Sequence, residues 1–337
     1  MQSREIRLRR RPTGVPEPDD FQLVTVEVPE PEEDEVTVRN LFMSVDPYMR
    51  GRMRERHSYA TPFEVGAVLS GGSVGVVTES LHPELEPGDA VLGNFGWRES
   101  FTTLGGKLRR LGPLEDLPAP PQAYLGVLGL TGMTAYVGLL EVADLQEGET
   151  VFVSGAAGAV GSVAGQIAKI HGCRVLGSAG SRKKIDWITQ ELGVDYAFDY
   201  HEGRLGEHLR EGAPEGLDVY FDNVGGSHLE AAIGHMRRFG RIALCGAISQ
   251  YNDAEPPPGP RNLFRAITMG LTLRGFLVSQ FNEMADEFRT AMTQWLDDGR
   301  VKYRETIRDG IESAPEAFIG LFDGENMGKM LVRLGKA

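Results

Sequence analysis

The sequence predicts an α/β protein of two domains, because two different patterns follow each other along its 337 residues. Residues 21–110 consist of short apolar runs separated by glycine and proline, which is typical of a β-rich, partly barrel-shaped domain. From about residue 147, nearly continuous apolar runs alternate with stretches of about ten to fifteen residues that have helical character. That alternation indicates a Rossmann-type parallel sheet with helices on both faces.

The expected β-rich domain covers residues 1–122 and is rejoined by about 304–337. Its strands are expected at 21–28, 35–45, 73–80, 89–96 and 97–104. A basic run at 4–11 is followed at once by acidic residues, so we interpret it as a solvated first strand rather than a targeting arm. The proline-rich segment 113–121 ends the pattern.

The expected Rossmann-type domain covers residues 123–303. Its strands are expected at 150–156, 173–180, 196–200, 217–226, 241–249 and 271–278. Helices are expected at 161–172, 181–193, 228–240 and 286–300. The segments 302–310 and 328–334 read as strands that return to the first domain.

The composition excludes several classes of function. The formal net charge of −13 argues against a nucleic-acid surface. Residues 118–140 carry no charge, but their glycines and prolines favour a buried turn and helix over a membrane span. No signal peptide is visible, so we expect a cytoplasmic protein. Cys173 and Cys245 each lie in an apolar run and are expected to be reduced core thiols.

The stretch SGAAGAVG at 154–161 is the first candidate binding motif. Gly158 and Gly161 fit the glycine pattern that brings backbone close to a pyrophosphate and lets a helix pack on a strand, while Ala156 replaces the usual first glycine. A glycine turn of this kind also occurs without a ligand. The strand before it, the helix after it and the second strand favour the dinucleotide interpretation.

The end of the second strand indicates which dinucleotide is bound. NAD sites usually carry an acid there for the adenosine ribose, but this sequence has LGSAGSRKK, ending in Ser181, Arg182, Lys183 and Lys184. Cations would pair with a 2′-phosphate through charge-assisted hydrogen bonds, so NADPH is favoured over NADH. The alternative is an ordinary solvated helix start.

The first domain offers no zinc site of the alcohol dehydrogenase kind. Residues 1–150 contain no cysteine and only His57 and His82, so we expect no metal. A Tyr-x-x-x-Lys pair after a strand, the general-acid arrangement of short-chain reductases, is also missing. The sequence therefore predicts hydride chemistry in an apolar cleft with phenols nearby.

Several motifs together resemble one family. VDPYMR at 45–50, AGSRKK at 179–184, FDNVGG at 221–226, CGAISQYN at 245–252 and ENMGKMLV at 325–332 accompany the glycine turn. Almost the whole chain is similar to the zinc-independent medium-chain dehydrogenases and reductases, in the group of prostaglandin, alkenal and curcumin reductases. The resemblance implies a GroES-like first domain, a homodimer, and NADPH-dependent reduction of the C=C bond of α,β-unsaturated carbonyl compounds.

The resemblance also implies the site residues. The cofactor residues would be Gly158, Ala159, Val160, Gly161, Ser181, Lys184, Tyr200, Asn223, Cys245, Gly246, Ala247, Ile248, Ser249, Gln250, Tyr251 and Asn326. Phe276, Leu277 and Val278 would form an apolar wall beside cofactor and substrate, with Tyr48 and Tyr59 on the substrate side. Tyr251 is the candidate catalytic residue, because a hydrogen bond to the carbonyl oxygen stabilises the charge that develops there. Its alternative role, and that of Tyr48, is packing.

Two other functions remain open from the sequence. The same fold can serve a quinone reductase, and related folds include nucleotide-binding proteins without turnover. An acceptor panel would separate them. The particular substrate depends on the shape of the pocket.

Overall fold

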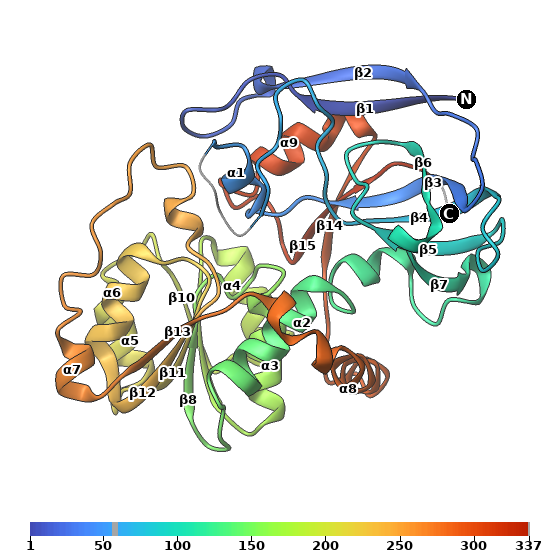
Figure 1. Ribbon diagram of the computed structural model, residues 1–337. Helices are drawn as coiled ribbons and strands as arrows, with labels where there is room; N and C mark the ends of the chain where they lie inside the picture. The colour runs from blue at the N-terminus through green and yellow to red at the C-terminus, as the bar shows by residue number, and fades with distance from the viewer. Residues whose placement is uncertain (56–59, 336–337) are drawn as a thin grey trace. The chain divides into compact units, whose positions relative to one another are not determined.

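The computed structural model describes residues 1–55 and 60–335, which fall into two compact units (Figure 1). The first unit contains Met1–Leu125, Glu305–Asn326 and the chain from Met330 onward. The second unit contains Gly126–Arg304 together with Met327–Lys329. Each unit has its own sheets and is described separately.

The first unit is β-rich, as the sequence predicts. Its main sheet has the order β14-β15-β3-β4-β5-β7, with β6 paired to β3, and β1 pairs with β2 in a separate antiparallel ladder. Two short helices, α1 (Met49–Arg52) and α9 (Ala314–Ile319), accompany the sheets. The strands are β1 (Gln2–Leu8), β2 (Phe21–Glu27), β3 (Glu35–Ser44), β4 (Ser73–Ser80), β5 (Asp89–Gly93), β6 (Ser100–Leu104), β7 (Arg109–Pro113), β14 (Glu305–Asp309) and β15 (Lys329–Arg333).

The basic N-terminal run forms strand β1 and the loop that follows it, which confirms the interpretation as a first strand. Arg4 pairs with Glu99 at 2.6 Å, and Arg10 pairs with Asp20 at the same distance. Ile6 and Leu8 lie between these cations in the sequence and are buried in the core of the first unit. The positive charges are therefore balanced within the unit.

The second unit is a doubly wound parallel sheet. Its order, β10-β9-β8-β11-β12-β13, corresponds to 3-2-1-4-5-6 along the chain, and every neighbouring pair is parallel. This is the order expected for a Rossmann-type domain. The strands are β8 (Thr150–Val153), β9 (Arg174–Ala179), β10 (Tyr196–Asp199), β11 (Leu217–Asp222), β12 (Met236–Leu244) and β13 (Thr272–Gly275).

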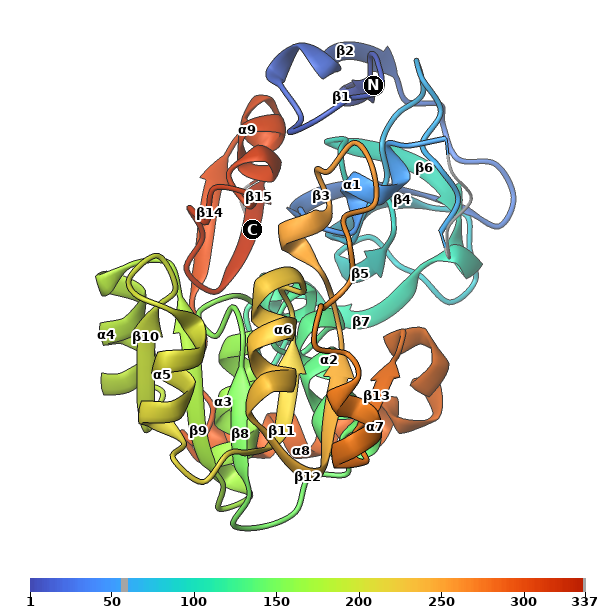
Figure 2. The same cartoon turned by 90° about the vertical axis from the view of Figure 1, so that its left-hand side faces the viewer.

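Helices cover both faces of this sheet, as Figures 1 and 2 show. Helices α5 and α6 pack side by side on one face, and α3 and α4 follow β8 and β9 on the other. Between the layers, Phe152 stacks on Tyr220 with ring centroids 4.9 Å apart, inside a buried apolar cluster. The helices are α2 (Leu130–Val137), α3 (Gly161–Ile170), α4 (Arg182–Gln190), α5 (Leu205–Gly212), α6 (Gly226–His235), α7 (Arg265–Met269) and α8 (Ala285–Asp297).

One predicted helix is too long. The sequence pattern extends it from 228 to 240, but α6 ends at His235 and Met236–Gly240 already belong to strand β12. Pairing of Met236 with Leu217 takes these residues into the sheet, and the register then shifts before Arg241 pairs with Val219. Phe239 adopts a left-handed conformation with φ of 64° at this bulge. Tertiary pairing therefore overrides the local helical preference.

The uncharged stretch 118–140 folds as a turn and a helix, as predicted. It contains the turn Pro121–Leu125, helix α2 and the beginning of a π-helical turn, Gly138–Val142. In the described part of the chain, no helix combines the length and apolar character that a membrane crossing requires.

Candidate functional site

The strand order places the candidate site at the carboxyl edge of the second unit's sheet. The order of the strands reverses between β8 and β11, because β8 leads to β9 on one side while β11 leads to β12 on the other. In open α/β sheets, ligands bind at such a switch point, outside the carboxyl ends of the strands. The loops after β8, β9, β10, β11 and β12 contain most of the residues predicted to bind the cofactor.

The glycine turn after β8 needs glycine at two positions, Gly155 and Gly161. Gly155 has a φ of +61°, which favours glycine, and the Ala156 amide donates to Ser178 O on β9 at 2.9 Å. A Cβ added at Gly161 would lie 2.3 Å from Gly155 O, so a side chain there would push the first turn of α3 away. The packing role expected of the third glycine in a dinucleotide turn is therefore filled by Gly161.

A short segment from near the C-terminus runs beside this turn. Gly328 N donates to Ala157 O at 2.9 Å, and Gly158 and Gly328 form an isolated parallel bridge. Asn326 lies two residues before Gly328 in the chain but is grouped with the first unit. The sequence did not indicate that Met327–Lys329 belong with the Rossmann-type unit.

The turn between β9 and α4 carries the predicted phosphate residues. Ser181 is the N-cap of α4, and its side chain makes no capping hydrogen bond. Lys184 is half-buried, and burial lowers the pKa of its ammonium group. Arg182 is exposed and bonds Asp186 at 2.8 Å on the outside of the helix. Of these cations, Lys184 has most to gain from an anion, because it is already partly desolvated.

Tyr200 folds back over the same turn. A Cβ added at Gly180 would lie 2.7 Å from the Tyr200 hydroxyl and 3.1 Å from Cε1 of His201. Tyr200 also packs edge-on against His228 of α6, with ring centroids 5.3 Å apart. Burial, followed by the charge of Asp199, raises the pKa of Tyr200, so its hydroxyl keeps its proton.

A buried carboxylate joins the ends of β8 and β11. Asp222 Oδ1 accepts hydrogen bonds from the amides of Val224 and Gly225 at 3.0 and 2.8 Å. It lies 2.6 Å from the Tyr220 hydroxyl and 3.3 Å from Ser154 Oγ. Burial raises the pKa of Asp222, whereas these hydrogen bonds favour its charged form. The carboxylate thereby fixes the turn that follows β11.

Asn223 makes the second tie between these strands. Its side-chain amide donates to Ser154 O at 2.8 Å, and its backbone amide donates to Ser154 Oγ at 3.0 Å. The sequence assigned Asn223 to the cofactor, and the structure shows that this side chain also holds the carboxyl end of β8.

Residues 245–251 dock on the turn after β11. The amides of Cys245 and Gly246 donate to Asp222 O at 2.9 and 3.0 Å, and Ser249 donates to Val224 O through both its amide and its hydroxyl. Tyr251 folds back so that the Ala247 amide donates to its hydroxyl at 3.2 Å. A hydroxyl oxygen that accepts in this way still carries a proton to donate. The structure therefore brings the predicted segment together around Tyr251.

The residues of the predicted apolar wall, Phe276, Leu277 and Val278, differ in burial. Phe276 is buried, and its ring meets Phe221 and Phe281 edge-on with centroids 6.4 Å apart, so it packs within the second unit. Leu277 and Val278 are only partly buried at the end of β13. Tyr48 belongs to the first unit, where it packs against the apolar core. Tyr59 lies outside the described residues, as does His57.

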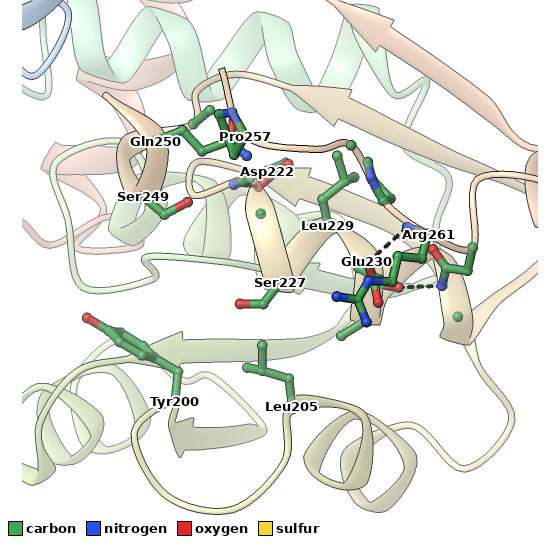
Figure 3. Close-up of a pocket in the computed structure, with 18 of the residues that line it drawn as sticks. Tyr200, Leu205, Asp222, Ser227, Leu229, Glu230, Ser249, Gln250, Pro257 and Arg261 are labelled. Carbon is green, nitrogen blue, oxygen red and sulfur yellow. Dashed lines mark hydrogen bonds between the residues drawn. The ribbon is translucent and has the colours of Figure 1, made fainter. Parts of the chain in front are cut away.

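A cleft of about 1390 Å³ opens among these loops (Figure 3). Tyr200 and Leu205 line one side, and Ser227, Ser249 and Gln250 lie across from them. The predicted cofactor residues that line the cleft are Tyr200, Cys245, Gly246, Ala247, Ser249, Gln250 and Tyr251. The glycine turn, Ser181, Lys184 and Asn223 are not part of its lining.

The cysteines and histidines are the residues that could support thiol chemistry or bind a metal ion. Both cysteines are free, as predicted, and burial raises the pKa of Cys245 to about 12. The ring of His82 accepts a hydrogen bond from the Glu84 amide in its own loop. Within residues 1–55 and 60–335, no three histidine, cysteine, aspartate or glutamate side chains are grouped to hold a metal ion.

Sequence reasoning missed the supports behind the site. Ser154 and Asp222 belong to recognisable motifs and Tyr220 to a predicted strand, but the sequence assigns these side chains no role, although an acid before Asn and two glycines at a strand end is a sign of a fixed turn. His201 and His228 have no sequence signal, because their positions depend on how β10 and α6 pack.

The sheet, the glycine turn and the lysine-bearing turn after β9 define a protein that binds a dinucleotide across a parallel sheet. Two family models match the chain, "N-terminal domain of oxidoreductase" over residues 4–111 and "Zinc-binding dehydrogenase" over residues 159–297. Each model covers most of one of the two expected domains.

Similar proteins align over nearly the whole chain. YfmJ of Bacillus subtilis (strain 168) is 47% identical over 98% of this chain and 97% of its own. The NADP⁺-dependent 2-alkenal reductase of Nicotiana tabacum is 42% identical over 99% of this chain and 98% of its own. The crystal structure of CurA from Vibrio vulnificus in complex with NADPH has a TM-score of 0.95 and 39% identity, covering 99% of this chain and 100% of that chain. The chain belongs to the medium-chain dehydrogenase/reductase family, in the group of prostaglandin, alkenal and curcumin reductases.

The buried imidazole of His228 predicts a pH-dependent stability. Burial lowers its pKa from 6.5 to about 4, so between these pH values the unfolded chain binds more protons than the folded chain. The free energy of unfolding should therefore fall as pH drops from about 6.5 to 4, by up to about 3 kcal/mol from this group. The measurement is urea unfolding of wild type and His228→Gln across this range.

The difference in the free energy of unfolding between wild type and His228→Gln reports on His228 alone, because the carboxyl groups that titrate in the same pH range are present in both proteins. His201→Gln, which changes an exposed histidine, is the matched control and should follow wild type. A difference that stays flat from pH 4 to 7 would contradict the assignment.

Proposed function

We propose that this protein reduces the C=C bond of α,β-unsaturated carbonyl compounds, with NADPH as the hydride donor. Membership of the family makes the chain an NADP-dependent oxidoreductase. The observation that carries the proposal is the full-length similarity to a 2-alkenal reductase, combined with an intact Tyr251 segment at the switch point. The chemistry of each part of the site supports it.

The residues present fit a phosphorylated dinucleotide. The turn at 155–161 has only glycine, alanine and valine side chains and leads directly into the first turn of α3, which suits a pyrophosphate. Ser181 and Lys184 follow β9 where an NAD site would carry an acid, and Tyr200 adds a hydroxyl over the same turn. We assign these groups to the adenosine 2′-phosphate.

Bound NADPH supplies the hydride that adds to the β-carbon of the conjugated alkene. Addition there moves negative charge onto the carbonyl oxygen, and a hydrogen-bond donor at that oxygen lowers the barrier. Tyr251 is our candidate donor, because the Ala247 amide donates to its hydroxyl oxygen and thereby positions a phenol, a group that can both accept and donate a hydrogen bond. The α-carbon then takes a proton from water or from a phenol.

The supports of the site keep Tyr251 in position. Its segment is pinned to the turn after β11 by four backbone carbonyl contacts, to Asp222, Asn223 and Val224. Leu277 and Val278, partly exposed at the end of β13, are our candidates for an apolar wall that excludes water. We assign Tyr48, Tyr59 and Asn326 to the site by family resemblance.

Product analysis tests the proposed function. The purified protein should oxidise NADPH much faster than NADH when given an enal or enone, and the product should be the saturated aldehyde or ketone. Mass spectrometry or NMR of the product separates this from the allylic alcohol that C=O reduction would give. Turnover of quinones alone, or NADPH binding without any acceptor, would overturn the proposal.

Tyr251→Phe should lower kcat with an enone by about 10²-fold if the hydroxyl stabilises developing charge, with a smaller effect on the KM for NADPH. Steady-state kinetics with the same enone measures this. Tyr196→Phe is the matched control, since its hydroxyl lies 3.5 Å from His208 Nδ1 beside α5 and away from the Tyr251 segment. A decrease below about threefold would make Tyr251 a packing residue.

We also propose that two copies associate through the β13 edge of the sheet. β13 is the last strand in the order, so its outer backbone groups form an edge of the kind that pairs with another chain. Beside it, Phe264 is 70% exposed and Ile267 is 76% exposed, with Phe239 and Leu263 nearby on β12 and before α7. Exposed aromatic and aliphatic groups next to an open edge suit a self-complementary interface.

Light scattering should give twice the mass of a single chain for wild type, and Ile267→Asp should shift the protein towards the monomer. Leu81→Asp changes an exposed leucine in the first unit, where the side chain is 58% exposed, and should leave the mass unchanged. A monomeric wild type would overturn the dimer.

A further inference from the structure

Two side chains from the end of β10 close over the turn that begins α4. Gly180 has no side chain, and the Tyr200 hydroxyl and the His201 ring occupy the space beside it, since an added Cβ would lie 2.7 Å from the hydroxyl and 3.1 Å from Cε1 of His201. The two rings lie against each other, with centroids 4.2 Å apart. Both therefore reach the start of the helix that carries Ser181 and Lys184.

Asp199 fixes the orientation of His201. Its Oδ1 accepts from the His201 amide and pairs with His201 Nδ1, each at 3.0 Å. When Nδ1 carries the proton shared with this carboxylate, Nε2 is the ring nitrogen that gains a proton and becomes a donor. The His201 side chain remains 64% exposed, so a ligand can reach it.

The charges around His201 favour an anion. Lys184 and Lys183 lie on α4 after the same turn, while Arg182 is engaged with Asp186. His228, which contacts the other face of Tyr200, is kept neutral by burial because its pKa is about 4. Glu202 follows His201 in the loop, where its backbone oxygen pairs with His208. Asp199 is already committed to His201 itself.

We propose that His201 is a specificity-determining residue that binds the 2′-phosphate of NADPH as a second cation beside Lys184. The proposal rests on the proposed function and adds to it a second nitrogen donor from the end of β10, the imidazole that Asp199 orients. The preference for NADPH over NADH should therefore depend on His201 as well as on Lys184.

Binding of 2′,5′-ADP and 5′-AMP, measured by calorimetry, tests the proposal without catalysis. The two probes differ only in the 2′-phosphate. At pH 6.5, His201→Gln should weaken 2′,5′-ADP about five- to tenfold and 5′-AMP less than twofold. His201→Lys should restore the affinity, because it returns a cation to the same place.

Rescue by lysine separates a charge effect from a packing effect, because His201→Lys returns a positive charge without the imidazole ring. Equal losses for both probes, or no loss of 2′,5′-ADP binding in His201→Gln, would overturn the proposal.

Lys184→Ala distinguishes this proposal from the proposed function. If Lys184→Ala weakens 2′,5′-ADP while His201→Gln does not, the role of His201 falls and NADPH specificity stands. If wild type binds the two probes equally, the protein does not recognise the 2′-phosphate, and the proposed preference for NADPH is disproved as well. The melting temperature of each variant confirms that it is folded.

Discussion

The candidate site depends on one buried carboxylate, that of Asp222. Its side chain gathers donors from β8, from β11 and from the turn that follows, while its backbone oxygen accepts from the first two residues after β12. A charged group in this position is costly unless its hydrogen bonds are made, and each donor left unmatched would cost about 1–3 kcal/mol. The ends of the three central strands therefore keep one arrangement relative to each other. That arrangement holds both Asn223 and the Tyr251 segment.

A second constraint on the site is the close packing at two glycines, where a side chain would not fit. Gly161 lets the first turn of α3 sit against Gly155, and Gly180 lets Tyr200 and His201 cover the start of α4. In the site that we propose, the two glycines would serve different ends of the dinucleotide, Gly161 at the pyrophosphate and Gly180 at the adenosine phosphate. Backbone approach and charge recognition would then be separated along the same edge of the sheet.

The fold could be predicted because the local sequence patterns are enough to identify most of its strands and helices. Alternating apolar and helical segments gave the parallel sheet, and short strands between glycines gave the β-rich unit. Predictions went wrong where non-local contacts decide. Met236–Gly240 have helical character but pair with β11, and Met327–Lys329 attach to the glycine turn from far along the chain. Short α5 was overlooked because its eight residues include two glycines.

Site residues could be predicted only where a short sequence motif indicates their function without knowledge of the tertiary packing. Sequence motifs identify the glycines, the lysines and Tyr251. They do not show that the ring of Phe276 packs in the core, or that His201 and His228 both contact Tyr200. The arrangement also explains why one fold can keep its cofactor and change its acceptor. In our proposal, cofactor recognition rests on strand ends tied by Asp222, while the acceptor meets loops and partly exposed residues such as Leu277 and Val278. Substitutions among the latter leave the buried ties intact, so the specificity for the acceptor can vary without loss of the dinucleotide site.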